Sequence, residues 1–239
     1  MNVCMAHRGW SGKAPENTMK AIELALAEPA IGAIEVDVQL SRDGVPVLFH
    51  DFSLERTTNG SGRVQDLTLA ELRELDAGSW FDERFAGEPI PMLEEVLAAV
   101  KGRCTLNIEL KTVADMHPGL AERVLTLLDR HGMKQDVYLT SFDHELIRQV
   151  RQLDTDVKTG LIVYGRPIMI LEQLRQAGAD VLSMSYPFLT RELACEAINE
   201  GVGVIAWTVD DPDAIRRIME WHPQVQICTN HPDRMLALR

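Results

Sequence analysis

Glu35 and Asp37 are the first residues of the chain whose types and spacing suggest chemistry. They stand two apart in a β-rich run, AIEVDV, and side chains two apart on a strand point to the same side. Two carboxylates on one side repel each other unless a cation lies between them. Glu109 is a third carboxylate near the end of a similar run, LNIELK. Three carboxylates without a nearby thiolate form a hard oxygen site, which suits Mg²⁺ or Ca²⁺ better than Zn²⁺.

A competing interpretation treats Glu35 and Asp37 as exposed loop acids. Glu109 would then simply pair with Lys111. Two cationic residues favour the interpretation that these carboxylates belong to a functional site. Lys111 lies two residues after Glu109, and Arg8 follows the first strand-like run. An acidic protein that gathers these two side chains and a divalent ion in one place is suited to bind a compact anion such as phosphate.

His7 and His50 are the candidates for proton transfer. His7 ends the first strand-like run, which Gly9 interrupts at once, and His50 is expected to face His7 across the site. Two imidazoles beside a phosphoryl group can divide the work, because one removes a proton from the nucleophile and the other donates one to the leaving oxygen. The histidines in or beside predicted helices are expected to be solvated: His117, His131, His144 and His222.

An alternation of strands and helices predicts the scaffold that positions these residues. Strands are expected at 3–6, 33–38, 104–110, 137–141, 158–163, 180–185, 202–209 and 225–229. Helices are expected at 18–28, 93–101, 118–131, 143–153, 168–177, 190–200, 212–221 and 232–238. Eight such units in 239 residues match a (β/α)₈ TIM barrel better than an open doubly wound sheet.

The interval between the second and third strands is too long for one loop and one helix, which indicates an insertion at residues 41–91. Asp43 and Gly44 precede the run VPVLFHD, and an Asp-Gly turn there predicts a hairpin that brings His50 back towards the acidic strand. Barrel strands end at the catalytic face, so an excursion after strand two can wall a pocket there. The rest of the insertion, with GSWF at 78–81, could form a lid.

Composition limits the remaining possibilities. With 239 residues and 46% apolar content, the chain is long enough for one large core, so a single domain over 1–239 is expected. A formal net charge of −12 argues against a nucleic-acid partner. No apolar run is long enough to span a bilayer, and no basic leader begins the chain, so a cytoplasmic protein without membrane insertion is expected. The four cysteines are scattered and are expected to be reduced.

The residues named above also occur as an ordered set of motifs that resembles the glycerophosphodiester phosphodiesterase family. The set comprises His7-Arg8-Gly9, Pro15-Glu16-Asn17-Thr18, Glu35-x-Asp37, Asp43-Gly44-Val45-Pro46-Val47 leading to His50-Asp51, and Glu109-x-Lys111. GSWF, PMLEEVL (91–97) and AWTVD (206–210) also resemble family blocks, so the resemblance covers nearly the whole chain.

The resemblance implies a TIM barrel with a small subdomain after strand two and a metal-dependent hydrolase of glycerophosphodiesters, which are small molecules. It further implies a divalent ion on the residues matching Glu35, Asp37 and Glu109, an acid/base pair at His7 and His50, and phosphate-binding cations at Arg8 and Lys111. Glu16 and Asn17 would lie close to the site. Trp207 is a candidate contact for glycerol or the alcohol group, with plain barrel packing as the competing interpretation.

Two positions depart from the family pattern. The last strand of relatives often ends in an acidic residue before proline, whereas here the run is Thr229-Asn230-His231-Pro232, and Asp210 stands where asparagine is frequent. Because neither is a proposed metal or acid/base residue, we expect these departures to affect only contacts at the rim.

Two other functions compete with hydrolysis of a water-soluble glycerophosphodiester. A related phosphodiesterase could act on lysophospholipid, but no apolar collar is evident in the sequence. A catalytically silent barrel could bind phosphodiesters, but none of the proposed carboxylates and histidines is missing. The head group, the choice between Mg²⁺ and Ca²⁺ and a homo-oligomeric state stay open from the sequence.

Overall fold

Eight parallel strands form a closed barrel in the computed structural model, which describes the backbone of residues 1–239 and every side chain except that of Asp115. The strands are β1 (Cys4–Ala6), β2 (Ala33–Leu40), β4 (Thr105–Leu110), β5 (Val137–Ser141), β6 (Lys158–Val163), β7 (Val181–Ser185), β8 (Gly203–Trp207) and β9 (Val225–Thr229). The barrel closes because β1 pairs with both β2 and β9. The predicted (β/α)₈ fold is confirmed, and each of the eight strands lies within two residues of its expected bounds.

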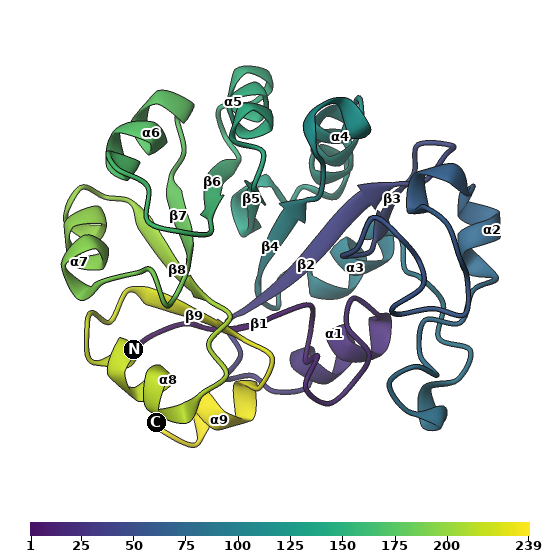
Figure 1. The fold of residues 1–239 in the computed structure, drawn as a ribbon, viewed down its shortest axis with the longest axis horizontal. Helices are drawn as coiled ribbons and strands as arrows, with labels where there is room; N and C mark the ends of the chain where they lie inside the picture. The colour runs from purple at the N-terminus through teal and green to yellow at the C-terminus, as the bar shows by residue number, and fades with distance from the viewer.

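The helices surround the strands, as Figure 1 shows. They are α1 (Met19–Leu26), α3 (Leu93–Val100), α4 (Leu120–His131), α5 (His144–Leu153), α6 (Ile170–Ala177), α7 (Arg191–Asn199), α8 (Pro212–Met219) and α9 (Pro232–Leu236). Several begin at a side-chain cap, such as Asp143 on α5 and Asp211 on α8, where a carboxylate accepts from a free backbone N–H. Their buried faces pack on the strands in one large hydrophobic cluster, and each buried aliphatic side chain contributes about 1.5–3 kcal/mol.

The segment between β2 and α3 is the one interruption of the barrel pattern. The strand β3 (Pro46–Leu48) runs antiparallel to β2, with Val38 opposite Leu48 and Leu40 opposite Pro46. Gly44 turns the chain with a φ of 77°, which a glycine adopts without steric cost. The predicted hairpin is therefore confirmed.

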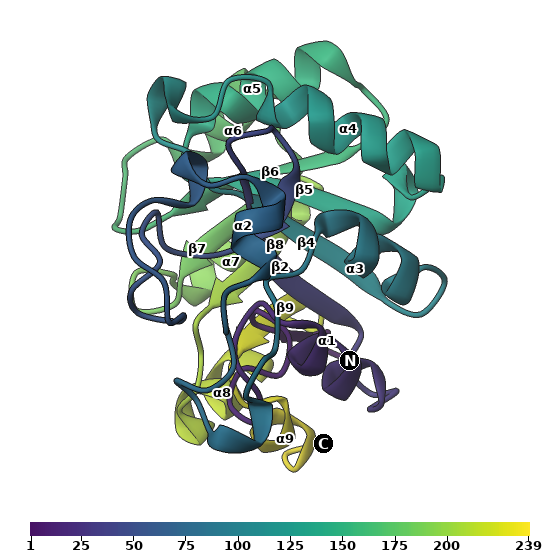
Figure 2. The same cartoon turned by 90° about the vertical axis from the view of Figure 1, so that its right-hand side faces the viewer.

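The rest of this segment lies at one side of the barrel (Figure 2). It contains α2 (Leu69–Arg73) and the short 3₁₀ helices η1 (Val64–Asp66) and η2 (Glu83–Phe85), whereas η3 (Ala114–Met116) and η4 (Lys134–Asp136) lie elsewhere. A second hydrophobic cluster holds it together, formed by Val47, Phe49, Leu54, Val64, Leu72, Ala77 and Ile90. Outside this cluster, the aromatic rings of Trp80 and Phe81 in the same segment pack against each other. Among the described residues, no helix combines the length and the apolar character needed to cross a membrane.

Candidate active site

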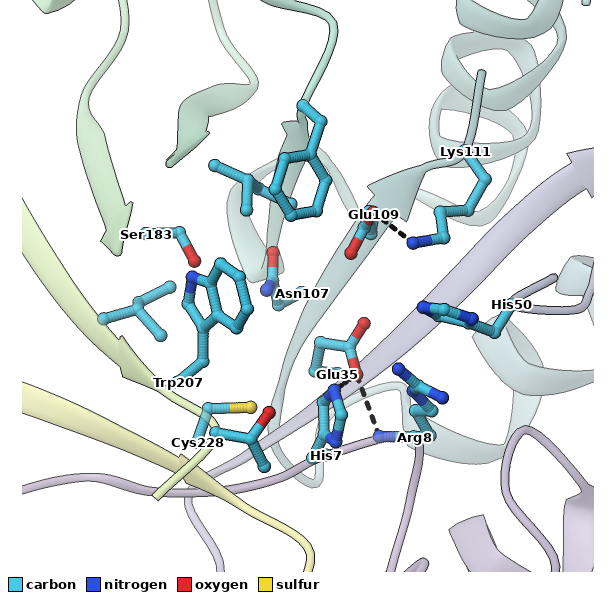
Figure 3. A pocket seen from close by; sticks show the side chains of 14 residues that line it. His7, Arg8, Glu35, His50, Asn107, Glu109, Lys111, Ser183, Trp207 and Cys228 are labelled. Atoms are coloured by element: carbon cyan, nitrogen blue, oxygen red, sulfur yellow. Dashed lines mark hydrogen bonds and ion pairs between the residues drawn. The ribbon is translucent and has the colours of Figure 1, made fainter. Parts of the chain in front are cut away.

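A pocket opens at the carboxyl ends of the barrel strands and collects almost all of the predicted functional residues (Figure 3). Its polar side is formed by His7, Arg8, Glu35, His50, Asn107, Glu109 and Lys111. Its other side is mostly apolar and is formed by Phe142, Ile162, Ser183, Ile205, Trp207, Thr208 and Cys228. Within the described part of the chain, none of residues 78–81 lines this pocket, so the insertion reaches it through His50 rather than through the GSWF segment.

Three carboxylates converge at the pocket floor. Glu35, Asp37 and Glu109 each offer an oxygen, and these oxygens lie within 4.8 Å of one another. The strand register explains this, because Asp37 on β2 is paired directly with Glu109 on β4. Glu35 is 4% exposed and Asp37 only 1%, which rules out the interpretation that they are exposed loop acids. The pairing of Glu109 Oε1 with Lys111 Nζ does occur, at 2.7 Å.

The charges of the three carboxylates are not balanced by the protein alone. Burial, followed by repulsion from Asp37 and Glu109, raises the pKa of Glu35 well above its usual value. Burial and Asp37 raise the pKa of Glu109 to about 7. Burial also acts on Asp37, but Arg8 and Lys111 outweigh it and lower its pKa. The remaining repulsion is what a bound cation would relieve.

A further sign of a missing partner is an orphaned atom. Glu35 Oε1 is buried and has no hydrogen-bond partner among the described residues, whereas Glu35 Oε2 accepts from the backbone N–H of Arg8 at 2.8 Å. Buried carboxylate oxygens are rarely left unpaired. The three residues therefore fit a hard divalent cation such as Mg²⁺ or Ca²⁺ by donor type, number and spacing.

The turn after β1 places Arg8 among these carboxylates. Arg8 has a φ of 56°, a left-handed conformation that costs a non-glycine residue about 1–2 kcal/mol. Gly9 follows with a φ of 76° and packs so closely that an added Cβ would lie 2.7 Å from the backbone of Ala21. The Arg8 guanidinium binds Glu16 at 2.7 Å and lies 3.3 Å from Asp37. Close packing at Gly9 and the two ion pairs of Arg8 thus hold its guanidinium at the edge of the pocket despite the strained backbone.

His7 lies at the end of β1 with both ring nitrogens near polar atoms. Its Nδ1 is 2.7 Å from Asn230 Oδ1, and its Nε2 is 3.8 Å from Glu35 Oε2. Burial, and then the charge of Arg8, lower the pKa of His7 to about 4. The expectation that the departure at Asn230 affects only the rim is wrong, because Asn230 contacts a proposed catalytic residue directly.

His50 is held by the inserted segment. Gln39 Nε2 donates to the carbonyls of Phe49 and Asp51, at 2.9 and 2.7 Å, which fixes the backbone on both sides of His50. The Nδ1 of His50 is 2.6 Å from Asp51 Oδ1. Burial lowers the pKa of His50, while the carboxylates of Asp37 and Asp51 oppose that shift.

Arg56 connects Asp51, the partner of His50, to the barrel. It donates to Asp51 through Nε at 2.6 Å and to Glu16 through Nη1 and Nη2, at 2.9 and 2.7 Å. Glu16 in turn accepts from Arg8. A chain of charges therefore runs from His50 in the insertion to Arg8 in the barrel.

Trp207 satisfies both interpretations of its role, since it lines the pocket and also packs against aromatic neighbours. Its ring centroid lies 5.7 Å from that of Phe142, edge to face, and 6.4 Å from that of Tyr164. Tyr164 is 72% exposed and Val113 is 59% exposed. These residues stand in the loops after β4, β5 and β6, so the structure does show an apolar rim that was not evident in the sequence.

Residues 7–234 match the model of the Glycerophosphoryl diester phosphodiesterase family. The chain belongs to this family. A glycerophosphodiester phosphodiesterase of Caldanaerobacter subterraneus subsp. tengcongensis is 35% identical over 237 residues, which cover 99% of this chain and 97% of that relative. One from Bacillus subtilis is 32% identical, with 97% and 84% covered. The resemblance found in the sequence and the prediction of a glycerophosphodiester phosphodiesterase enzyme are confirmed.

A solved structure of similar fold comes from Oleispira antarctica. That phosphodiesterase was crystallised in complex with the product sn-glycerol-3-phosphate, and its TM-score with this chain is 0.92 at 30% sequence identity. The match covers 99% of this chain and 96% of the other. The barrel and the excursion after β2 are thus shared with a structure that binds a phosphate ester.

Sequence reasoning missed several residues around this phosphodiesterase pocket. His117 was expected to be solvated, which is wrong: it is 6% exposed and its Nε2 lies 3.4 Å from Oε1 of Gln39. The other three helix-associated histidines are half-buried. Gln39 and Arg56 were also missed. An inward-facing glutamine on a fully buried strand was the available signal for the first, whereas nothing local distinguishes Arg56 from a surface arginine.

Proposed function

We propose that the chain hydrolyses glycerophosphodiesters to an alcohol and sn-glycerol 3-phosphate, with a divalent cation and two histidines. The observation that carries this proposal is the convergence of three buried carboxylates, two cations and two imidazoles on one pocket. The Oleispira antarctica structure of similar fold, which holds sn-glycerol-3-phosphate, supports the choice of product.

We assign the cation to Glu35, Asp37 and Glu109. When bound there, it supplies positive charge that neutralises the phosphodiester and favours the more highly charged transition state. Mg²⁺ and Ca²⁺ both accept an all-oxygen set of this kind.

Arg8 and Lys111 bind the phosphate oxygens in this proposal. Both already face the pocket, and both touch Asp37, at 3.3 and 3.4 Å. Arginine suits a phosphate because its planar fork can donate two parallel hydrogen bonds. Trp207 contributes an apolar surface beside them for the glycerol or the alcohol group.

His7 and His50 move the protons. The nucleophile, either water or the neighbouring hydroxyl of the glycerol, forms a bond to phosphorus while the bond from phosphorus to the alcohol oxygen breaks. Water gives sn-glycerol 3-phosphate directly, whereas the hydroxyl gives a cyclic phosphate, which water then opens by breaking the phosphorus bond to that hydroxyl oxygen. One imidazole takes the proton of the nucleophile, and the other gives a proton to the departing oxygen. In both histidines Nδ1 is already occupied, by Asn230 and Asp51 respectively, so Nε2 is the nitrogen available for this step.

A panel of glycerophosphodiesters, assayed with EDTA and with metal add-back, tests the proposal. We expect release of sn-glycerol 3-phosphate, loss of activity on chelation and recovery with Mg²⁺ or Ca²⁺. Undiminished turnover after thorough chelation would remove the cation from the mechanism. No turnover of any diester by the metal-loaded protein would leave the phosphodiester-binding, catalytically silent barrel as the better account.

The apolar rim supports a second candidate, a lysophospholipase D-like phosphodiesterase. Phe142 lines the pocket and is 46% exposed, and Val113 and Tyr164 flank it on neighbouring loops. Large exposed apolar side chains beside a pocket can accept an acyl chain. Comparing the turnover of glycerophosphocholine with that of lysophosphatidylcholine decides between the two substrates.

We further propose that residues 41–91 form an inserted subdomain within one domain over 1–239, as the separate hydrophobic cluster of that segment suggests. A cytoplasmic location and the absence of a nucleic-acid partner stay predictions, and the question of a homo-oligomeric state stays open.

A further inference from the structure

Asn230 lies beside His7 because the barrel closes there. β1 and β9 are paired with Ala6 opposite Thr229, so the next residue of each strand emerges at the same edge. The backbone N–H of His7 donates to the carbonyl of Thr229 at 3.0 Å, and the side chains meet at 2.7 Å between His7 Nδ1 and Asn230 Oδ1. The contact is therefore fixed by the register of two barrel strands.

Asp210 determines which end of the Asn230 amide faces His7. Asp210 Oδ2 accepts from Asn230 Nδ2 at 2.7 Å, and Asp210 Oδ1 accepts from the backbone N–H of Asn230 at 2.8 Å and from Thr229 Oγ1 at 2.9 Å. A carboxylate that receives three donors acts only as an acceptor, and an amide nitrogen acts only as a donor. The amide nitrogen must therefore point to Asp210, which leaves the amide oxygen for His7.

The amide oxygen in turn determines where the imidazole carries its hydrogen. Because Asn230 Oδ1 can only accept, neutral His7 must be protonated on Nδ1, and its Nε2 is left with a free lone pair. That nitrogen is on the side of Glu35 and the pocket. We infer that Asn230 and Asp210 are positioning residues that fix the tautomer and the ring orientation of His7.

This inference rests on the proposed role of His7 and extends it to residues outside the pocket lining. It also connects the two departures noted in the sequence, because Asp210 and Asn230 are the two ends of one hydrogen bond. The negative charge is thereby placed one residue away from the imidazole, with a neutral amide between them.

The tautomer can be read directly from the ¹⁵N chemical shifts of the histidine rings in the full-length protein. His144 supplies an internal reference of the opposite kind, since its Nε2 lies 3.0 Å from the carbonyl oxygen of Ile162, which can only accept. His7→Gln assigns the His7 signals by their disappearance. We expect neutral His7 to be protonated on Nδ1, and a wild-type spectrum showing Nε2–H at His7 would overturn the inference.

Asn230→Leu removes the acceptor and keeps the number and branching of the side-chain heavy atoms. We expect the His7 signals to shift from Nδ1–H towards Nε2–H and kcat to fall roughly 10–100-fold, as for the loss of other outer-sphere partners of functional histidines. KM should change little, because Arg8 and Lys111 are untouched. Asn199→Leu, at the exposed end of α7, is the matched control and should change neither quantity.

The exchange variant Asp210→Asn/Asn230→Asp separates positioning from general damage. Asn230→Asp alone sets two carboxylates 2.7 Å apart, whereas the exchange restores one donor and one acceptor, so we expect it to recover the Nδ1–H tautomer and most of the lost kcat. Failure of the exchange to improve on either single variant, in a protein that still folds, would contradict the inference. If Asn230→Leu does not fold, the wild-type spectrum and Asp210→Asn still decide it, because loss of Asp210 should mix the two tautomers.

Failure of the positioning role of Asn230 and failure of the proposed function would give different results. A wild-type protein that turns over no glycerophosphodiester would refute the proposed reaction but would leave the tautomer measurement valid. Normal turnover together with unchanged His7 signals in Asn230→Leu would refute only the positioning role.

Discussion

The two histidines face one pocket but are supported by different kinds of structure. His7 belongs to a barrel strand, and its partner is a neutral amide held by hydrogen bonds between neighbouring strand ends. His50 belongs to the inserted segment, and it is supported by the charged series Asp51, Arg56 and Glu16. The side chain of His7 is 15% exposed, that of His50 30% and that of Arg56 44%.

The comparison predicts that the two sides of the site differ in rigidity. Strand register fixes the neighbourhood of His7 as part of the fold itself. The neighbourhood of His50 depends on ion pairs that are partly open to solvent, and exposed pairs of this kind typically contribute only about 0–1 kcal/mol each. We therefore expect the His7 side to resist changes of solvent and the His50 side to respond to them.

Removal of either imidazole should have the largest effect. For His7→Ala and His50→Ala we expect kcat to fall by about 10² to 10⁴, because each loses one of two proton transfers. The kcat of the double variant should be little lower than that of the less active single variant, because the effects of groups that act in one step are not additive. His222→Ala, remote from the pocket, is the control, and near-normal turnover in both site variants would refute the acid/base assignment.

Core substitutions test whether the inserted segment can loosen without the barrel. Leu72→Ala, in the cluster of the insertion, and Leu97→Ala, in the barrel cluster, delete the same atoms from fully buried sites. We expect each to cost about 2–5 kcal/mol. For Leu72→Ala the loss of amide protection from hydrogen exchange should be confined to residues 41–91. Loss of protection throughout the barrel would show that the two regions unfold as one.

The contacts that hold His7 and His50 also show which features could be predicted from the sequence. Glu35 and Asp37 were recognisable because their spacing of two is a local property of a strand, and the hairpin was recognisable from its Asp-Gly turn. The pairing of His7 with Asn230 was not, because it joins residues 223 positions apart in sequence and exists only when β1 and β9 close the barrel. The link from Arg56 to Glu16 spans 40 positions and depends on how a loop packs, which no periodicity reports.

The burial of His117 was mispredicted for a similar reason. Its position beside a helical pattern indicated a surface residue, but the loop before α4 folds inward and places the ring 3.4 Å from Gln39. Loop packing of this kind is set by tertiary contacts rather than by the local pattern. The sequence therefore predicted the elements and the inner carboxylates well and the connections between loops poorly.

Arg56→Met probes the charged support alone. It keeps the aliphatic part of the side chain but removes the ion pairs with Asp51 and Glu16, so Asp51 loses its partner Arg56 and can turn away from His50. We expect kcat to fall about tenfold, at the lower end of the range for outer-sphere partners, because the arginine is partly exposed. Arg148→Met, which breaks an exposed pair with Glu145 on α5, is the matched control. A loss as large as that of His50→Ala would mean that Arg56 contacts substrate itself.

Acid should weaken the His50 support at a defined pH, and this is the smallest of the expected effects. Although burial opposes it, hydrogen bonds from Arg56 and His50 lower the pKa of Asp51 from 3.8 to about 2. A carboxyl whose pKa is depressed on folding stabilises the protein above the unfolded value and loses that contribution as the pH falls through the folded value.

Asp51 should therefore stabilise the fold fully above about pH 5 and progressively less down to about pH 2, with a total of about 1 kcal/mol after allowance for solvent screening. The measurement is the free energy of unfolding of the wild type and of Asp51→Asn across this range, in which the two curves should converge as the pH falls. Curves that stay parallel would show that the carboxylate has the same pKa in the folded and unfolded chain. The ion pairs around His50 would then orient the ring without stabilising the protein, and the contrast with the hydrogen-bonded support of His7 would be one of geometry alone.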